Sequence, residues 1–493
     1  MTDERLKIVK YINDPVYGGI GITQLELDLI STPVFQRLRG LKQVARLNFI
    51  FPSAEHSRYV HSIGVLYIMS LMTEQLEKQG MLDPEDVVKM RVAALLHDIG
   101  HYPLSHLGEA VYSYCMDREG ETEKKPLYYM ASFHSKSADH EYLGKYIVTH
   151  NLELRSILEK YGLDPEEIGE IFTGECGARN MVYTQLIHSS LDADRLDYML
   201  RDSYQTGVKY GMVNLQYLVR LLMVVEDPSL RGNNKVLAFN KKGQYVVEHF
   251  LMSRYFYYSQ VIFHKTNVAF EGMVKCMYIR LVQSGHFLYQ SLEEIQESIN
   301  DEKFLSFNDS FLETAAKEYY DHTEDEEFKR LYEMFRDRIR PKVIFEMKDM
   351  YENSPSQEFS VLKYELQKNP DKISELIGTD RWGYQIAPLM IEKIHNSYKV
   401  AEKNADFEDL REAVKLYDMD TGQLSYLAGD KQSVVNKLAN YKTEFIRVYV
   451  LEEKGKKYDY ETIQYIFIVI NSCLRHECAG QHRELHPHAQ DAE

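Results

Sequence analysis

The chain of 493 residues is long enough to bury a large hydrophobic core, either as one helical body or as about three domains. It contains 44% hydrophobic residues, yet no apolar run reaches the roughly 18 residues that a transmembrane helix requires. The net charge of −17 disfavours binding to nucleic acid and to anionic membrane surfaces. The first residues lack an apolar signal core, so we expect a cytoplasmic protein.

The N-terminal half shows a short β pattern followed by helical spacing. Residues 8–23 are rich in β-branched side chains and contain Asp-Pro and Gly-Gly turn signals, which predict a pair of strands. From there to about residue 225, apolar residues recur at helical spacing. Thr32 and Pro33 are typical of an N-cap and a first helical residue.

Further along, residues 227–250 predict a small hairpin, and residues 250–350 a second helical block. Residues 352–382 carry turn residues and polar runs, whereas FIRVYVLEE (445–453) reads as a strand and YETIQYIFIVINSCLR as a helix. The predicted class is therefore mostly α, with a smaller α+β C-terminal region. We divide the chain into a core (1–350), a regulatory or oligomerisation region (351–475) and a disordered tail (476–493).

The most informative stretch is ALLHDIGHYPLSH, residues 94–106. An apolar helical run delivers His97 and Asp98 side by side, and Gly100 and Pro103 end the helix directly afterwards. At a helix end, two adjacent ligands of this kind can face one divalent cation. In isolation, the same pair would equally fit an ordinary helix end with a His–Asp hydrogen bond.

The separated segments SRYVHS (57–62), HDIGHYPLSH and LDADRLDYMLRDS (191–203) lead to a resemblance. In their order and residues they resemble the HD-domain phosphohydrolases, and more closely the HD-domain deoxynucleoside triphosphate (dNTP) triphosphohydrolases, which include vertebrate and dGTPase-like bacterial members. The resemblance covers residues 8–270 and, more faintly, the FIRVYV segment. It implies a helical HD-domain core with a hydrolytic site.

The resemblance also implies which residues bind the metal. One divalent ion per site (Fe, Mn, Zn or Mg, with Mn or Mg supporting activity) is expected on His61, His97, Asp98 and Asp194. Two imidazoles and two carboxylates suit such an ion chemically. From the residues alone, Asp192 and Asp197 are alternatives to Asp194.

Proton transfer is assigned by the same resemblance. His101 and His140 match the catalytic histidines of the family, Glu141 follows the second of them, and His106 and Glu109 match residues that support the site. Glu109 stands where the family has an aspartate. His134 is a nearby competitor of His140, and His106 fits equally a structural role.

The resemblance implies that Arg58, Arg195 and Arg254 bind phosphate, and that Gln43 and Asp202 contact the sugar 3′-hydroxyl. A surface salt bridge is the alternative for Arg254. Tyr198 shares a helical stripe with Asp194 and Asp202, at i, i+4 and i+8. Ile262 replaces a family tyrosine that stacks on the base.

A nucleotide activator between subunits is a further implication of the resemblance. The residues that match its binding site are Gln36, Arg37, Arg39 and Arg447. The alternative is that these arginines are structural cations within one subunit. An activator that bridges subunits would require a homo-oligomer, a dimer or a tetramer.

We therefore expect metal-dependent hydrolysis of dNTPs to a deoxynucleoside and tripolyphosphate. The alternatives are an HD phosphodiesterase that acts on a signalling or cyclic nucleotide or on nucleic-acid ends, and a non-catalytic nucleotide sensor. A zinc protease is disfavoured, because its motif requires glutamate after the first histidine and this chain has Asp98.

Overall fold

The structure is a computed structural model of the chain. It describes residues 3–117, 139–176, 180–228, 230, 234–377, 379–389, 413–439 and 441–451. The predicted helix at 460–475, the predicted tail at 476–493 and the competing His134 lie outside the described residues.

The N-terminal strand pair is present as predicted. Strands β1 (Ile8–Asp14) and β2 (Gly18–Thr23) pair in antiparallel fashion. Helix α1 (Gln24–Ile30) begins with a capping box in which the Thr23 and Glu26 side chains bond to each other's backbone N–H. Helix α2 (Pro33–Gln36) begins at Pro33, and Thr32 caps it, as expected.

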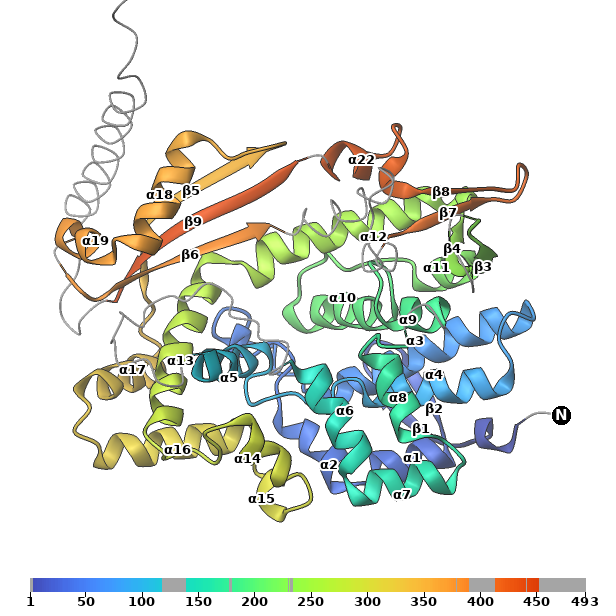
Figure 1. Ribbon diagram of the computed structural model, residues 1–493, viewed down its shortest axis with the longest axis horizontal. Helices are drawn as coiled ribbons and strands as arrows, with labels where there is room; N and C mark the ends of the chain where they lie inside the picture. Colours follow the sequence, from blue (N-terminus) through green and yellow to red (C-terminus); the bar gives the residue numbers. More distant parts are fainter. Residues whose placement is uncertain are drawn as a thin grey trace, which may run out of the picture.

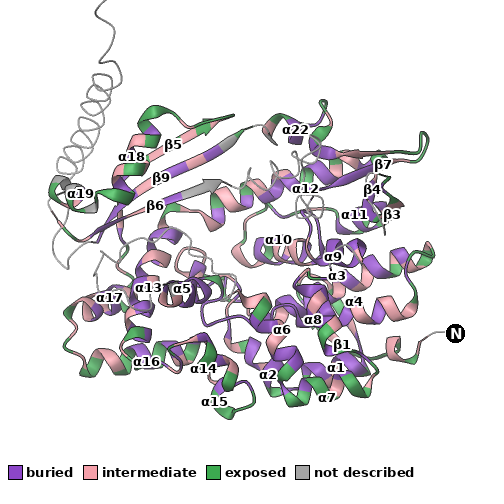
Figure 2. Ribbon diagram, viewed as in Figure 1, coloured by how far each residue is buried: buried purple, intermediate pink, exposed green. Residues whose placement is uncertain are grey.

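A helical body follows and holds the largest hydrophobic core, whose buried residues run from Ile20 to Leu451. Figures 1 and 2 show helices packed around a buried centre. Its helices are α3 (Arg58–Lys78), α4 (Pro84–Leu96), α5 (His106–Asp117), α6 (His140–His150), α7 (Leu152–Lys160), α8 (Pro165–Phe172), α9 (Met181–Ile187), α10 (Ala193–Thr206), α11 (Leu215–Leu221), α12 (Gln244–Tyr257), α13 (Lys265–Gln283), α14 (Leu292–Glu297), α15 (Glu302–Leu305), α16 (Asp309–His322) and α17 (Glu326–Arg336).

The predicted hairpin at 227–250 is wrong in its bounds. The observed hairpin joins β3 (Leu222–Glu226) to β4 (Lys235–Asn240), and residues 244–250 already belong to α12. Val247, Phe250 and Leu251 are all buried, and their spacing of three and four residues is that of one helix face. The apparent alternation in this segment was too short to separate a strand from a helix.

The C-terminal region contains an antiparallel sheet with its own core. Its strands are β5 (Lys342–Tyr351), β9 (Lys442–Val450) and β6 (Trp382–Leu389), in that order. Helices α18 (Gln357–Lys368) and α19 (Pro370–Ile377) pack beside it (Figure 1). The helical prediction is therefore wrong for residues 342–350, and two helices occupy the segment that showed turn signals. The strand predicted near 445–453 is present as β9.

The remaining strands tie the C-terminal region to the helical body. β7 (Lys415–Asp418) pairs in parallel with β4 and in antiparallel fashion with β8 (Gln423–Tyr426), giving the order β3-β4-β7-β8. Helix α22 (Val434–Ala439) follows. A division at residue 350 stays a prediction, since β5 begins before it and β7 completes a sheet that starts in the core.

Candidate active site

Three helices bring the predicted metal ligands together. His61 lies in the first turn of α3, His97 and Asp98 follow the last residue of α4, and Asp194 lies in the first turn of α10. The Nε2 atom of His61 is 2.9 Å from Oδ1 of Asp194 and 3.6 Å from Oδ2 of Asp98. The Nε2 atom of His97 is 3.3 Å from Oδ1 of Asp98 and 3.8 Å from Oδ1 of Asp194.

Both imidazoles are oriented through their other ring nitrogen. Nδ1 of His61 lies 2.7 Å from Oδ2 of Asp197, and Nδ1 of His97 lies 2.8 Å from the carbonyl oxygen of Ala94. When Nδ1 donates to these oxygens, each Nε2 is left with a free lone pair toward the common centre. Asp197 also accepts hydrogen bonds from Arg201, so it supports the site from behind His61. Asp194 is the aspartate that faces the common centre.

The donor set fits a divalent cation. Nε2 of His61 and Nε2 of His97 are buried and have no hydrogen-bond partner in the described part of the chain. The ligand atoms of His61, His97 and Asp98 all lie within 4.8 Å of one another. Although burial alone lowers the pKa of His61, Asp194 and Asp197 raise it to about 10. This excess of negative charge is what a bound cation would offset.

Close backbone approaches explain two glycines at the site. A Cβ on Gly64 would lie 1.9 Å from Oδ1 of Asp197, so the absence of a side chain lets α3 and α10 meet. A Cβ on Gly100 would lie 2.1 Å from the carbonyl oxygen of His140. Gly100 thus allows the loop after Asp98 to touch the start of α6.

The loop between α4 and α5 has an unusual backbone that sequence reasoning missed. Leu104 and Ser105 both have left-handed conformations, with φ of 62° and 55°. Asp309 accepts a hydrogen bond from the Leu104 N–H at 2.7 Å, and the Ser105 hydroxyl donates to the carbonyl of Lys42 at 2.7 Å. Arg58 Nε donates to the same hydroxyl at 3.0 Å, which links this loop to the metal ligands.

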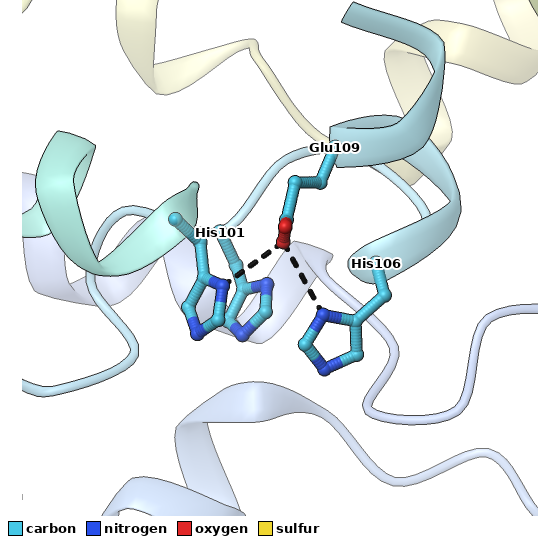
Figure 3. Close-up of side chains that lie close together, drawn as sticks. His101, His106 and Glu109 are labelled. Carbon is cyan, nitrogen blue, oxygen red and sulfur yellow. Dashed lines mark hydrogen bonds and ion pairs between the residues drawn. The ribbon is translucent and has the colours of Figure 1, made fainter. Parts of the chain in front are cut away.

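Figure 3 shows a second histidine cluster, which adjoins the metal ligands through His101 and Asp98. The rings of His101 and His140 stack at a centroid distance of 3.8 Å, and Nε2 of His101 lies 3.0 Å from Oδ1 of Asp98. Oε2 of Glu109 lies 2.9 Å from Nδ1 of His140 and 3.3 Å from Nδ1 of His106. The structure thus brings four of the five residues predicted for proton transfer together, and the His106 side chain remains exposed.

The two stacked histidines have opposite shifts in pKa. Burial, followed by the charge of Arg58, holds the pKa of His101 well below its usual value. Burial acts in the same direction on His140, but its hydrogen bond to Glu109 raises the pKa to about 9. At neutral pH the pair contains one neutral and one protonated imidazole, which is the division that acid and base roles require.

The residues predicted to bind substrate line one cavity of about 760 Å³ together with His97, Asp98 and Asp194. They are Gln43, Arg58, Arg195, Tyr198, Asp202 and Arg254. His140 and Glu141 line it as well, and Glu141 lies 3.6 Å from Nδ1 of His188. The cavity therefore brings metal ligands, cations and the candidate acid His140 into one volume.

Several cavity groups are already partly satisfied. Arg58 donates to Oδ2 of Asp98 at 2.8 Å, and Arg254 donates to the carbonyl of Ser190 at 3.3 Å. His56 lies 2.7 Å from Oδ1 of Asp202, whose other oxygen accepts from the Tyr257 hydroxyl. Sequence reasoning did not find His56 or Tyr257. His56 is two residues from Arg58, and this proximity was the available signal.

The four residues predicted to bind an activator differ in exposure. Arg37 is buried and donates to the carbonyls of Ile99, His101 and Phe307 at 2.7, 3.0 and 2.9 Å. The guanidinium of Arg37 faces the protein interior, which favours the alternative of a structural cation within one subunit. Arg447 pairs with Glu346 and donates to the carbonyl of Phe263 at 2.6 Å. Arg39 is exposed, lies over the Tyr59 ring and donates to Gln36.

Comparisons with known proteins agree with this geometry. Residues 58–200 match the sequence profile of the HD domain. The YwfO protein of Bacillus subtilis is 34% identical over 53% of each chain, and the deoxynucleoside triphosphate triphosphohydrolase SAMHD1 of Gallus gallus is 30% identical over 49% of this chain and 42% of its own. A phosphohydrolase from Bacteroides thetaiotaomicron shares the fold, with a TM-score of 0.62 and 23% identity over 90% of this chain and all of its own.

Residues 58–200 are therefore similar to the HD domain, and about half of the chain is similar to a deoxynucleoside triphosphate triphosphohydrolase. It spans about half the length of the curated relatives it matches. The HD domain is helical, as the mostly α prediction required, and it contains both histidine clusters. None of the helices in the described ranges is both long and apolar enough to cross a membrane.

Proposed function

We propose that the protein hydrolyses deoxynucleoside triphosphates to a deoxynucleoside and tripolyphosphate in a metal-dependent reaction. The observation that carries this proposal is the convergence of His61, His97, Asp98 and Asp194, of which the last three line the cavity that also contains three arginines. A divalent ion held by these four side chains would polarise a phosphate oxygen and lower the pKa of water.

The chain's own residues then have distinct tasks. Arg58, Arg195 and Arg254 offset the negative charge of the triphosphate, which develops further in the transition state. The protonated His140 gives its proton to the 5′ oxygen as that oxygen leaves, and Glu109 holds the ring in place through Nδ1. A water oxygen adds to the α-phosphorus as the bond to the 5′ oxygen breaks. His101 is neutral at the same pH and can accept the proton that this water loses.

Recognition of the sugar rests on Gln43 and Asp202. Both side chains line the cavity, and Oε1 of Gln43 is buried without a hydrogen-bond partner among the described residues. A ligand hydroxyl would satisfy this oxygen, so an analogue without the 3′-hydroxyl should bind less well. This contact supports a substrate that is a nucleotide, whose sugar the site recognises in addition to its phosphates.

The test is product analysis with purified protein, each dNTP in turn, and Mn²⁺ or Mg²⁺. We expect a deoxynucleoside and tripolyphosphate in equal amounts. Release of a monophosphate and pyrophosphate would overturn the reaction type, as would cleavage restricted to cyclic nucleotides or nucleic-acid ends. Nucleotide binding without turnover, in the presence of bound metal, would favour a sensor.

We also propose nucleotide activation in a homo-oligomer, a dimer or a tetramer, with Gln36 and Arg39 as the candidate contacts. Both lie at the start of the helical body, and Arg39 is exposed. Assays with pairs of dNTPs test activation, because an activator would raise the turnover of a second nucleotide.

A further inference from the structure

One wall of the cavity has no task in the chemistry above. Helix α13 and strand β6 form it, with the polar side chains of Asn267, Glu271, Lys275 and Gln385. Apolar and aromatic neighbours complete this wall: Phe263, Val268, Tyr384 and Ile386. It therefore combines surfaces on which a planar ring can lie with groups that form hydrogen bonds.

Glu271 and Lys275 are four residues apart on α13, so their side chains lie on one helix face. Opposite charges at this spacing pair elsewhere in the protein, as Glu74 and Lys78 do at 2.6 Å. Across the described ranges, Lys275 has no hydrogen bond or ion pair, and Glu271 accepts one hydrogen bond, from Asn267 Nδ2 at 2.9 Å. The pair is thus left open toward the cavity.

Burying these polar side chains without full partners costs free energy, and a ligand that bonds to them would remove this cost. Burial raises the pKa of Glu271 to about 7 and lowers the pKa of Lys275. Asn267 is 1% exposed, and its Oδ1 atom has no hydrogen-bond partner in the described part of the chain. Three polar groups without full partners, on one wall of a ligand-sized cavity, indicate a binding surface.

A nucleoside triphosphate can meet this wall with one end only. Its phosphates carry the negative charge and belong with the metal ligands and with Arg58, Arg195 and Arg254. The uncharged end is the base, and the α13 wall offers aromatic and apolar contact for it.

We propose that Glu271 and Lys275 read the base of the substrate and select guanine, an inference that rests on the proposed dNTP hydrolysis. The Watson–Crick edge of guanine presents two adjacent donors, N1–H and the 2-amino group, beside the acceptor O6. The carboxylate of Glu271 accepts from both donors, and the ammonium of Lys275 donates to O6.

Other bases satisfy this pair less fully. Adenine and cytosine each offer one amino group to the carboxylate, and thymine offers a single N–H between two carbonyl oxygens. A carboxylate that meets only one donor gives up a bidentate interaction. Such an interaction is worth about 10- to 100-fold in discrimination between bases.

The test uses 2′-deoxyinosine triphosphate (dITP), which lacks only the 2-amino group of dGTP. Equimolar dGTP and dITP are mixed with the protein and Mn²⁺, and the two deoxynucleosides are quantified at low conversion. This competition gives the ratio of the two kcat/KM values, and any activator acts on both substrates alike. We expect wild type to favour dGTP by about 10-fold or more.

Glu271→Gln should bring the dGTP:dITP ratio close to one. Lys275→Met should leave the dGTP:dITP ratio unchanged, because guanine and hypoxanthine both carry O6. It should lower the dGTP:dATP ratio, because adenine has no O6. The exposed Glu318→Gln and Lys431→Met serve as matched controls and should change neither ratio. Thermal unfolding verifies that each variant is folded.

Equal use of dGTP and dITP by wild type, or an unchanged ratio in Glu271→Gln, would overturn the assignment to guanine. Absence of any dNTP cleavage would instead refute the proposed reaction. In that case calorimetric binding of dGTP and dITP still decides the inference. A preference for dGTP that Glu271→Gln abolishes supports it, and equal binding refutes it.

Discussion

His140 stacks on His101 at a ring-centroid distance of 3.8 Å, and of the two imidazoles only that of His140 contacts Glu109. The pKa of His140 is raised to about 9, whereas that of His101 is held well below its usual value. Stacking of two cations would be repulsive, so protonation of one ring disfavours protonation of the other. Glu109 therefore determines which histidine is the acid.

The first prediction concerns the alkaline limb of the pH–rate profile. If His140 is the acid, kcat/KM should fall above pH 9 as the imidazole loses its proton. Glu109→Gln removes the carboxylate that raises this pKa, so the limb should move toward lower pH. The measurement is kcat/KM against pH for both proteins; an alkaline limb at the same pH in both would contradict the role of Glu109.

The same contact predicts a dependence of stability on pH. The folded pKa of His140 lies above the ordinary value of 6.5, so its stabilisation is fully present below pH 6.5 and is lost as the pH rises through about 9. The shift corresponds to roughly 3 kcal/mol at most. The free energies of unfolding of wild type and Glu109→Gln should therefore differ more at pH 6 than at pH 10. An equal difference at both values would contradict the linkage.

A third prediction tests the metal site through its ligands and their support. His61→Ala should abolish bound metal and turnover, because it removes one of two imidazole ligands. Asp197→Asn should weaken metal affinity by about 10- to 100-fold, since Asp197 orients His61 without facing the ion. Metal content by elemental analysis and a chelator titration measure both effects. Asp371→Asn, an exposed substitution, is the control; metal content of His61→Ala equal to that of the control would refute this site.

A fourth prediction concerns the contact between α3 and α10. Gly64→Ala places a Cβ 1.9 Å from Oδ1 of Asp197, so the helices must separate or Asp197 must move. We expect a loss of about 1–3 kcal/mol in the free energy of unfolding, together with weaker metal binding. Gly19→Ala is the matched control, because its Cβ meets only Tyr11 at 3.7 Å. Equal stability of the two variants in denaturant titrations would show that the contact relaxes without cost.

Local pattern explains what the sequence predicted well. The run before His97 is apolar at helical spacing, and Gly100 and Pro103 follow it as helix-breaking residues, so both the buried helix and its end were visible. The four metal ligands, by contrast, were implied by the resemblance of separated segments to a family, and their role as ligands stays a prediction. The left-handed backbone at Leu104 and Ser105 was not visible, since it depends on Asp309, which is distant in sequence. Strand β5 was missed for the same reason: its pairing partner β9 lies about a hundred residues further along the chain.

The fifth prediction separates a structural arginine from a regulatory one. Arg37→Met leaves the buried carbonyls of Ile99, His101 and Phe307 without their shared donor, which should cost about 3 kcal/mol of unfolding free energy. Arg39→Met removes an exposed contact with Tyr59 and should cost about 1 kcal/mol or less. If a nucleotide activator binds at this surface, Arg39→Met should lose activation in paired-dNTP assays while its melting temperature stays near that of wild type. Retained activation in Arg39→Met, with a correctly folded protein, would place any activator elsewhere.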